Sequence, residues 1–172
     1  MMYRMKKVGL FYSFNSRKTA KIAGIIHNSF SGDEVQLVNV DEVKKEHFLE
    51  FENLIIGVPT WFDGELPNYW DELLPALEDI DFSNKKIAVF GLGDQKGYPE
   101  NFCDAIGIMA NFFEEKGATI VGQIPVEGYA FEGSKAVKNG KFMGLPLDQE
   151  NQARLTNGRI ENWVTNLKND FN

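Results

Sequence analysis

Polar side chains suited to bind an anion gather between residues 13 and 19, directly after an apolar stretch that begins at Val8. Serine and threonine hydroxyls and backbone N–H groups are donors that a phosphate accepts. A helical pattern of apolar residues follows from Ile22, so the polar stretch lies where a helix dipole adds positive potential. A cluster of helix-capping residues without a ligand is the alternative, and this stretch alone favours neither. The residues concerned are Ser13, Phe14, Asn15, Ser16, Arg17, Lys18 and Thr19.

Two further stretches combine aromatic rings with glycine. The first runs from Pro59 to Gly64 and contains Trp61, and the second runs from Gly91 to Phe102 and contains Tyr98. Offset stacking of flat rings is worth about 1 kcal/mol beyond the area that the rings bury. Either ring alone is more simply explained as core or surface filler. Together with an anion-binding stretch, the two rings indicate a phosphorylated, flat, aromatic ligand held between Trp61 and Tyr98.

The apolar pattern predicts that strands and helices alternate along the chain. Strands are expected at 7–12, 35–40, 54–58, 87–90 and 118–121, with 145–147 resuming the last strand. Helices are expected at 19–30, 41–51, 70–77, 102–113 and 156–167, and a turn at 31–33. Residues 125–144 are polar and glycine-bearing, which predicts an irregular insertion outside the core. This alternation is typical of a doubly wound, five-stranded parallel sheet.

Ligands of such sheets bind beyond the carboxyl ends of the strands. Each of the three candidate stretches follows a strand, so we expect them to form one site. The glycine patterns of dinucleotide-binding folds and P-loops are absent. A phospho-receiver domain has the same order of elements, but it needs acidic residues where Ser13 and Pro59 stand.

Length, charge and cysteine content narrow the class of protein. The 172 residues suit a single domain, expected to span 1–172, and the formal net charge of −7 argues against nucleic acid and anionic membranes as partners. No apolar run is long enough to cross a membrane, and no secretory signal is expected at the start. The only cysteine is Cys103, which favours a reducing cytoplasm. Two isolated histidines, His27 and His47, indicate no metal site.

A series of longer motifs carries a family resemblance. These motifs are Ile55–Trp61, Gly64–Leu66, Phe90–Gln95, Gly97–Tyr98, Asn101–Phe102, Asp104–Gly107, Gly128–Tyr129, Ser134–Ala136, Asn139–Phe142, Gly144, Leu147–Asp148, Asn151–Gln152 and Arg159–Ile160. With them the chain resembles the flavodoxins, of the long-chain type with a split fifth strand. The resemblance implies a flavodoxin-like doubly wound sandwich, with sheet order 2-1-3-4-5, helices on both faces and an insertion in the fifth strand.

What the resemblance implies about function is a flavoprotein of electron transport. It would hold FMN non-covalently and carry single electrons at low potential in place of ferredoxin, between soluble or membrane-bound redox enzymes, without substrate turnover of its own. Expected partners have basic docking faces, such as ferredoxin/flavodoxin–NADP reductases, photosystem I or other ferredoxin-dependent enzymes, and the carrier would be a monomer. The residues expected to bind the cofactor are Ser13, Phe14, Asn15, Ser16, Arg17, Lys18, Thr19, Pro59, Thr60, Trp61, Phe62, Asp63, Gly64, Leu92, Gly93, Asp94, Tyr98, Asn101, Phe102 and Cys103, while Asp148 or Glu150 would reach the ribityl chain.

Two residues depart from the family pattern of the phosphate loop. Phe14 stands where a hydroxyl residue is usual, and losing one donor to a charged phosphate costs about 1.5–3 kcal/mol. Arg17 stands at a glycine position and would be strained if that position had a positive φ. The altered loop keeps open a regulatory module that has lost FMN. A further alternative, independent of the loop, is an FMN-dependent quinone or NAD(P)H oxidoreductase of the same fold.

Overall fold

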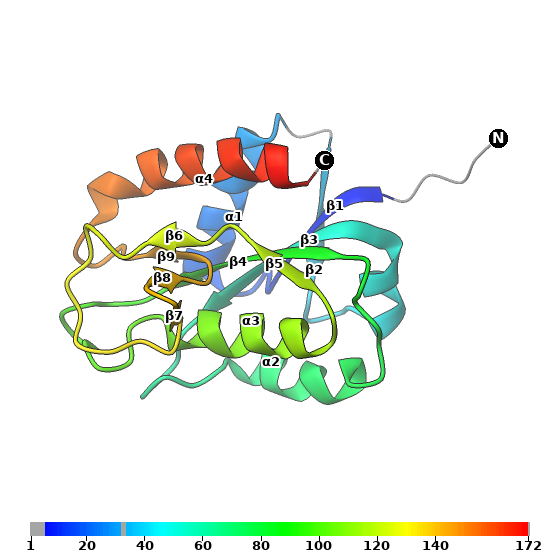
Figure 1. Cartoon of the computed structure of the whole chain (residues 1–172), viewed down its shortest axis with the longest axis horizontal. Coiled ribbons are helices and arrows are strands. Elements are labelled where there is room, and N and C mark those ends of the chain that lie inside the picture. The colour runs from blue at the N-terminus through cyan, green and yellow to red at the C-terminus, as the bar shows by residue number, and fades with distance from the viewer. Residues whose placement is uncertain (1–5, 32–33, 172) are drawn as a thin grey trace.

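A parallel sheet forms the centre of the molecule (Figure 1). The computed structural model describes residues 6–31 and 34–171, so Gly32 and Asp33 of the expected turn lie outside the described residues. The strand order β2-β1-β3-β4-β5 confirms the expected topology. The strands are β1 (Lys6–Tyr12), β2 (Val35–Asn39), β3 (Phe51–Pro59), β4 (Lys86–Leu92) and β5 (Thr119–Val121).

The fifth position of the sheet is shared by two short strands, as expected. β5 pairs in parallel with the first half of β4, from Lys86 to Ala88. β9 (Leu145–Leu147) pairs with the second half, from Phe90 to Leu92. The chain between the two contains the insertion, and it leaves the sheet opposite Ala88, in the middle of β4, and returns opposite Phe90.

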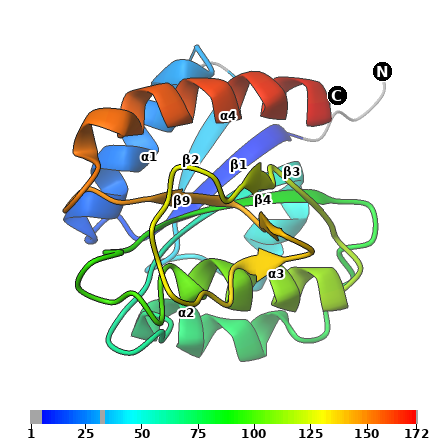
Figure 2. The same cartoon turned by 60° about the vertical axis from the view of Figure 1, so that its left-hand side comes forward.

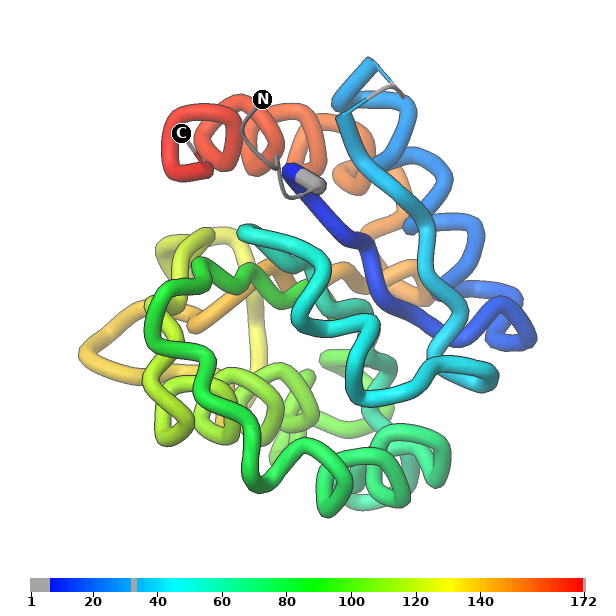
Figure 3. Tube along the Cα trace, turned by 90° about the vertical axis from the view of Figure 1, so that its right-hand side faces the viewer, coloured from blue at the N-terminus to red at the C-terminus, as the bar shows by residue number. Residues whose placement is uncertain are grey.

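Helices cover both faces of the sheet. α1 (Arg17–Ser29) and α4 (Thr156–Asp170) lie on one face, and α2 (Asn68–Leu73) and α3 (Asp104–Glu115) lie on the other (Figures 2 and 3). Successive strand residues point to opposite faces. In β3, Ile55 packs in the cluster that contains residues of α1 and α4, while Ile56 packs in the cluster that contains residues of α2 and α3. Continuous apolar runs are therefore required in the central strands, because both faces are buried.

Two expected helices are shorter than predicted. In the segment 41–51 only a 3₁₀ helix forms, from Lys45 to Glu50. The helix expected over 70–77 ends at Leu73 and continues as a 3₁₀ turn from Leu74 to Leu77, which contains Pro75. Proline lacks the N–H that an α-helix needs at that point. Among the helices of the described residues, none is both long and apolar enough to cross a membrane.

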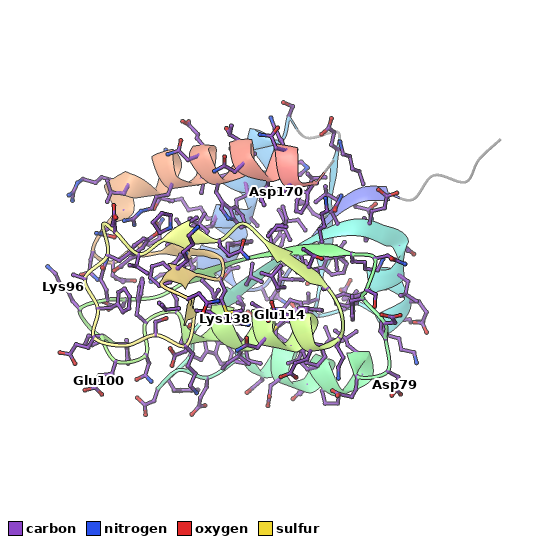
Figure 4. The ribbon with its side chains drawn as sticks, in the orientation of Figure 1. Asp79, Lys96, Glu100, Glu114, Lys138 and Asp170 are labelled. Atoms are coloured by element: carbon purple, nitrogen blue, oxygen red, sulfur yellow. The ribbon has the colours of Figure 1, made fainter. Side chains whose placement is uncertain are left out.

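The prediction that residues 125–144 are irregular and lie outside the core was wrong in part: residues 126–136 form no helix or strand, but the ends of the segment do form short strands. A three-stranded antiparallel sheet forms from β6 (Ile124–Pro125), β7 (Val137–Lys138) and β8 (Lys141–Phe142). Asn139 and Gly140 join the last two strands with φ of 54° and 77°, as in a tight hairpin with two left-handed residues. The Phe142 side chain is fully buried in the core. The hairpin is also joined to α3, because Lys138 Nζ lies 2.6 Å from Glu114 Oε1 (Figure 4).

Candidate functional site

The three polar and aromatic stretches meet at the carboxyl ends of β1, β3 and β4, where two adjoining cavities open. The cavities have volumes of about 490 and 400 Å³. Both are lined by Thr60, Trp61, Gly93, Asp94 and Tyr98. The larger also contacts Phe62, Asn101 and Cys103, and the smaller also contacts Ser16, Arg17, Lys18, Thr19, Pro59, Leu92, Gln149 and Glu150.

The start of α1 supplies the donors of the smaller cavity. The N–H groups of the first turn have no carbonyl acceptor within the helix, and the Ser16 side chain caps none of them. The Ser16 hydroxyl instead donates to Thr19 Oγ1 at 3.1 Å. Arg17 and Lys18 add cationic side chains to the same wall. This arrangement suits an anion, because helix N–H groups, dipole and side chains all favour negative charge there.

Arg17 carries no backbone strain. It is the first residue of α1, and it is absent from the four described non-glycine residues with positive φ, which are Ser31, Phe62, Cys103 and Asn139. An arginine at this position is therefore compatible with the helix, and the strain considered for it does not arise.

The first three residues of the predicted anion-binding stretch, Ser13, Phe14 and Asn15, make their contacts outside the two cavities. The Ser13 hydroxyl donates to Asp41 Oδ2 at 2.7 Å, and Asn15 Nδ2 donates to the same oxygen at 3.0 Å. The Phe14 N–H donates to Asn39 Oδ1 at 3.1 Å. The Phe14 ring packs against Tyr12 and is 46% exposed. None of Ser13, Phe14 and Asn15 lines either cavity.

The first aromatic loop is closed by two backbone hydrogen bonds. The Trp61 N–H donates to the Glu65 carbonyl at 2.8 Å, and the Glu65 N–H donates to the Trp61 carbonyl at 2.7 Å. The chain reverses between them, with φ of 49° at Phe62 and 93° at Gly64. The Phe62 side chain is 69% exposed and lines the larger cavity, whereas Asp63 and Gly64 line neither.

The second aromatic loop is held by the carboxylate of Asp94. Its Oδ1 accepts the Gly97 N–H at 2.8 Å, the Lys96 N–H at 3.1 Å and Asn151 Nδ2 at 2.8 Å. Tyr98 follows this turn, and its ring is 51% exposed at the rim of both cavities. Hydrogen bonds from Gly97 and then Asn151 hold the pKa of Asp94 below its ordinary value of 3.8.

A lowered pKa makes the contribution of Asp94 to stability depend on pH. The carboxylate stabilises the fold fully at pH values above the pKa that Asp94 has in the unfolded chain. This stabilisation is lost as the pH falls through the lower pKa that Asp94 has in the folded protein. We expect Asp94→Asn to lower the free energy of unfolding at pH 7 and the difference from wild type to shrink below about pH 3.8. Urea unfolding between pH 3 and pH 7 measures this difference. A difference that stays constant across that range would contradict the role of the carboxylate.

A second carboxylate lies buried behind the same loop. Asp148 is fully buried and accepts the Gln95 N–H at 3.0 Å and Gln95 Nε2 at 2.8 Å. It also accepts the Asn151 N–H and Nδ2, both at 2.9 Å. Asp148 does not line the cavities, and both its oxygens already accept hydrogen bonds, whereas Glu150 lines the smaller cavity and pairs with Lys18 at 2.5 Å.

Cys103 forms part of the wall of the larger cavity. It precedes α3 with a φ of 52°, and burial raises the pKa of its thiol well above the ordinary value. Asn101 also lines this cavity, but Phe102 is buried in the core and does not. Gln149 lines the smaller cavity and was missed by the sequence analysis; its only signal is its place between Asp148 and Glu150.

The sheet is parallel and doubly wound. Its carboxyl edge carries the anion-binding start of α1 and two aromatic loops. This combination defines an α/β protein that binds a nucleotide. Residues 10–163 match the family model described as Flavodoxin. The chain is 46% identical to a flavodoxin of a Nostoc species over 166 residues (96% of this chain and 98% of that one). It is 40% identical to the flavodoxin of Haemophilus influenzae over 168 residues (97% of each).

Solved structures agree with the sequence comparisons. The structure of Fusobacterium nucleatum flavodoxin bound to flavin mononucleotide has a TM-score of 0.91 and 37% identity, and the match covers 98% of this chain and 100% of that one. The chain belongs to the flavodoxin family. Flavodoxins are electron-transfer flavoproteins that use FMN.

Proposed function

We propose that this chain holds FMN non-covalently at the carboxyl edge of its sheet and carries single electrons at low potential in place of ferredoxin. The observation that carries the proposal is the continuity of the two cavities, which share Trp61 and Tyr98. One cavity suits an anion and the other suits a flat ring, so a single phosphorylated flavin would fill both.

The phosphate would lie at the first turn of α1. Its charge would meet the N–H groups of Arg17, Lys18 and Thr19, which have no acceptor within the helix. Arg17 and Lys18 would add charge–charge attraction. Lys18 is at present paired with Glu150, an exposed contact of the kind that contributes at most about 1 kcal/mol and gives way to a stronger anion.

The flavin ring would lie against Trp61 and Tyr98. Gly93 lets the second loop pack directly against Cys103 in the wall of the larger cavity, because a Cβ there would lie 2.6 Å from Cys103 Sγ. When bound, FMN supplies the one-electron chemistry; the protein supplies the stacking rings, the anion site and the surrounding charge.

The charge of the protein supports a low potential. The chain has a formal net charge of −7, and Asp94 lies in the wall of both cavities with a pKa that keeps it ionised. Adding negative charge to a ring in these surroundings is unfavourable. We therefore place the second reduction step at strongly negative potential.

The proposal extends to partners, domain and location. An acidic carrier would meet basic docking faces of the ferredoxin/flavodoxin–NADP reductase type or of ferredoxin-dependent enzymes, in small and salt-sensitive encounters. We propose that residues 1–172 act as one monomeric domain. A reducing cytoplasm suits a chain whose only cysteine, Cys103, is buried as a free thiol.

Titration of the apo-protein with FMN tests the proposal, with flavin fluorescence as the readout. We expect binding of one FMN per chain with quenching by Trp61 and Tyr98, and no turnover of NAD(P)H with quinones. A chain that binds no FMN would support the regulatory alternative, and rapid quinone turnover would support the oxidoreductase alternative.

Removal of one stacking ring should weaken this binding. Tyr98→Ala is expected to raise the FMN dissociation constant by about tenfold, because stacking contributes about 0.5–1.5 kcal/mol beyond burial. Because the Tyr98 side chain is half exposed, the stability of the apo-protein should change little. Unchanged FMN affinity in this variant would show that Tyr98 does not contact the ring.

A further inference from the structure

A buried hydroxyl without a partner lies beside the site. Tyr69 is the second residue of α2, and its Oη is the only buried side-chain nitrogen or oxygen, among the residues that the structure describes, that lacks a hydrogen bond. Burying such a hydroxyl without a partner is unfavourable, because it loses its hydrogen bonds to water and gains none in the protein. Phenylalanine would fill the same space without this cost. A tyrosine here therefore points to a partner that arrives with a ligand.

The surroundings of this hydroxyl place it behind the anion-binding turn. Burial raises the pKa of Tyr69 to about 12, and the Ser16 hydroxyl lowers it in part, because it lies close to the Tyr69 oxygen although the pair lacks the geometry of a formed hydrogen bond. Asp41 is also near enough to raise the pKa. The carboxylate of Asp41 already accepts hydrogen bonds from Ser13 and Asn15. Ser16, which lines the smaller cavity, is thus the nearby group through which the hydroxyl would act.

Tyr69 also contacts the first aromatic loop. Its ring meets the Trp61 ring edge to face, with centroids 6.0 Å apart and an interplanar angle of 88°. One side chain therefore contacts the ring wall of the proposed flavin site and lies beside the residue that precedes α1. Since Trp61 lines both cavities, Tyr69 supports the point where they join.

We propose that Tyr69 is a specificity-determining residue that makes this site prefer FMN to a flavin without phosphate. Its hydroxyl donates to Ser16 Oγ, and the Ser16 hydroxyl turns from Thr19 Oγ1 to donate to the phosphate. This donor takes the place of the hydroxyl that is missing at Phe14, whose ring lies outside the cavity. The inference rests on the proposed function of FMN binding.

The test compares two ligands that share the ring and differ in the phosphate. Tyr69→Phe removes only the hydroxyl, and we expect its dissociation constant for FMN to rise about tenfold while that for riboflavin stays unchanged. This matches the loss of one hydrogen bond to a charged group. The thermal midpoint of the apo-protein should stay the same or rise, because an unpaired buried hydroxyl is removed.

Tyr129→Phe is the matched control. The Tyr129 hydroxyl is also largely buried, but it donates to the Pro146 carbonyl at 2.7 Å. Its removal should lower the thermal midpoint of the apo-protein and leave the ratio of FMN to riboflavin affinity unchanged. The two variants therefore separate a hydroxyl that stabilises the fold from one that serves the ligand.

Inorganic phosphate provides a second readout without a flavin. It should raise the thermal midpoint of the wild-type apo-protein more than that of Tyr69→Phe. If Tyr69→Phe binds FMN and keeps the wild-type ratio of FMN to riboflavin affinity, the inference about Tyr69 is wrong. The proposed function would be unaffected by that result. Failure of the wild-type protein to bind either flavin would overturn both.

Discussion

Replacement of Gly64 by alanine is expected to lower the free energy of unfolding by about 2–4 kcal/mol and to weaken FMN binding. Gly64 has a φ of 93°, where an L side chain is strained. A Cβ there would also lie under 3.0 Å from Asp104 Oδ2. Asp104 cannot move aside freely, because it is buried and its Oδ1 accepts the Lys135 N–H at 2.7 Å. The loop that carries Trp61 must therefore shift.

Gly140→Ala provides a control with the same strain and no clash. Gly140 has a φ of 77°, and a Cβ there would meet nothing within 4 Å. We expect it to cost about 1–2 kcal/mol without any change in FMN affinity. Urea unfolding and FMN titration of both variants isolate the contact with Asp104. Equal losses in the two variants would contradict this contact.

Asp148→Asn should cause the second large effect, a loss of about 2–4 kcal/mol in the free energy of unfolding. The carboxylate accepts four hydrogen bonds, two from Gln95 and two from Asn151. An asparagine amide has only one acceptor oxygen, so its NH₂ group would face N–H donors that stay unpaired. Because Gln95 follows Asp94 directly, we expect the second aromatic loop to loosen and FMN affinity to fall.

Gln95 extends this effect to the insertion. Its Oε1 accepts the Ala130 N–H at 2.5 Å, so the carboxylate, the second loop and the insertion form one connected network. Asp79→Asn is the control, because Asp79 lies exposed on the surface (Figure 4), and its stability should change by less than about 0.5 kcal/mol. An Asp148→Asn protein as stable as this control would show that the network carries little energy.

The layout of the sheet was predictable because its strands are buried on both faces. The run Leu54–Val58 is apolar at nearly every position, and in the structure all its side chains are buried in β3. Each of the three candidate stretches follows a predicted strand. Their common place at the carboxyl edge of the sheet could therefore be predicted without knowledge of contacts between distant residues. The helix predicted for residues 41–51 was wrong in extent. The few apolar residues there fit a helical spacing, but only a short 3₁₀ helix forms.

Details of the site depended on contacts between distant residues. Ser13 bonds to Asp41, which is 28 positions away, and no local pattern shows that its hydroxyl is occupied. The Asn139–Gly140 pair is a hairpin signal, but the strands of two residues beside it are too short for a periodicity to be seen. The sequence analysis did not single out Tyr69, and only its packing against Trp61 in the structure places it at the site.

Stepwise anaerobic reduction of the FMN-loaded protein, followed by its visible spectrum, tests the central claim most directly. A one-electron carrier should lose its yellow colour in two separate steps, with a long-wavelength band that rises in the first step and disappears in the second. The second midpoint potential should lie well below that of free FMN. A protein that gains no colour from FMN, or that is reduced in a single two-electron step, would contradict the account.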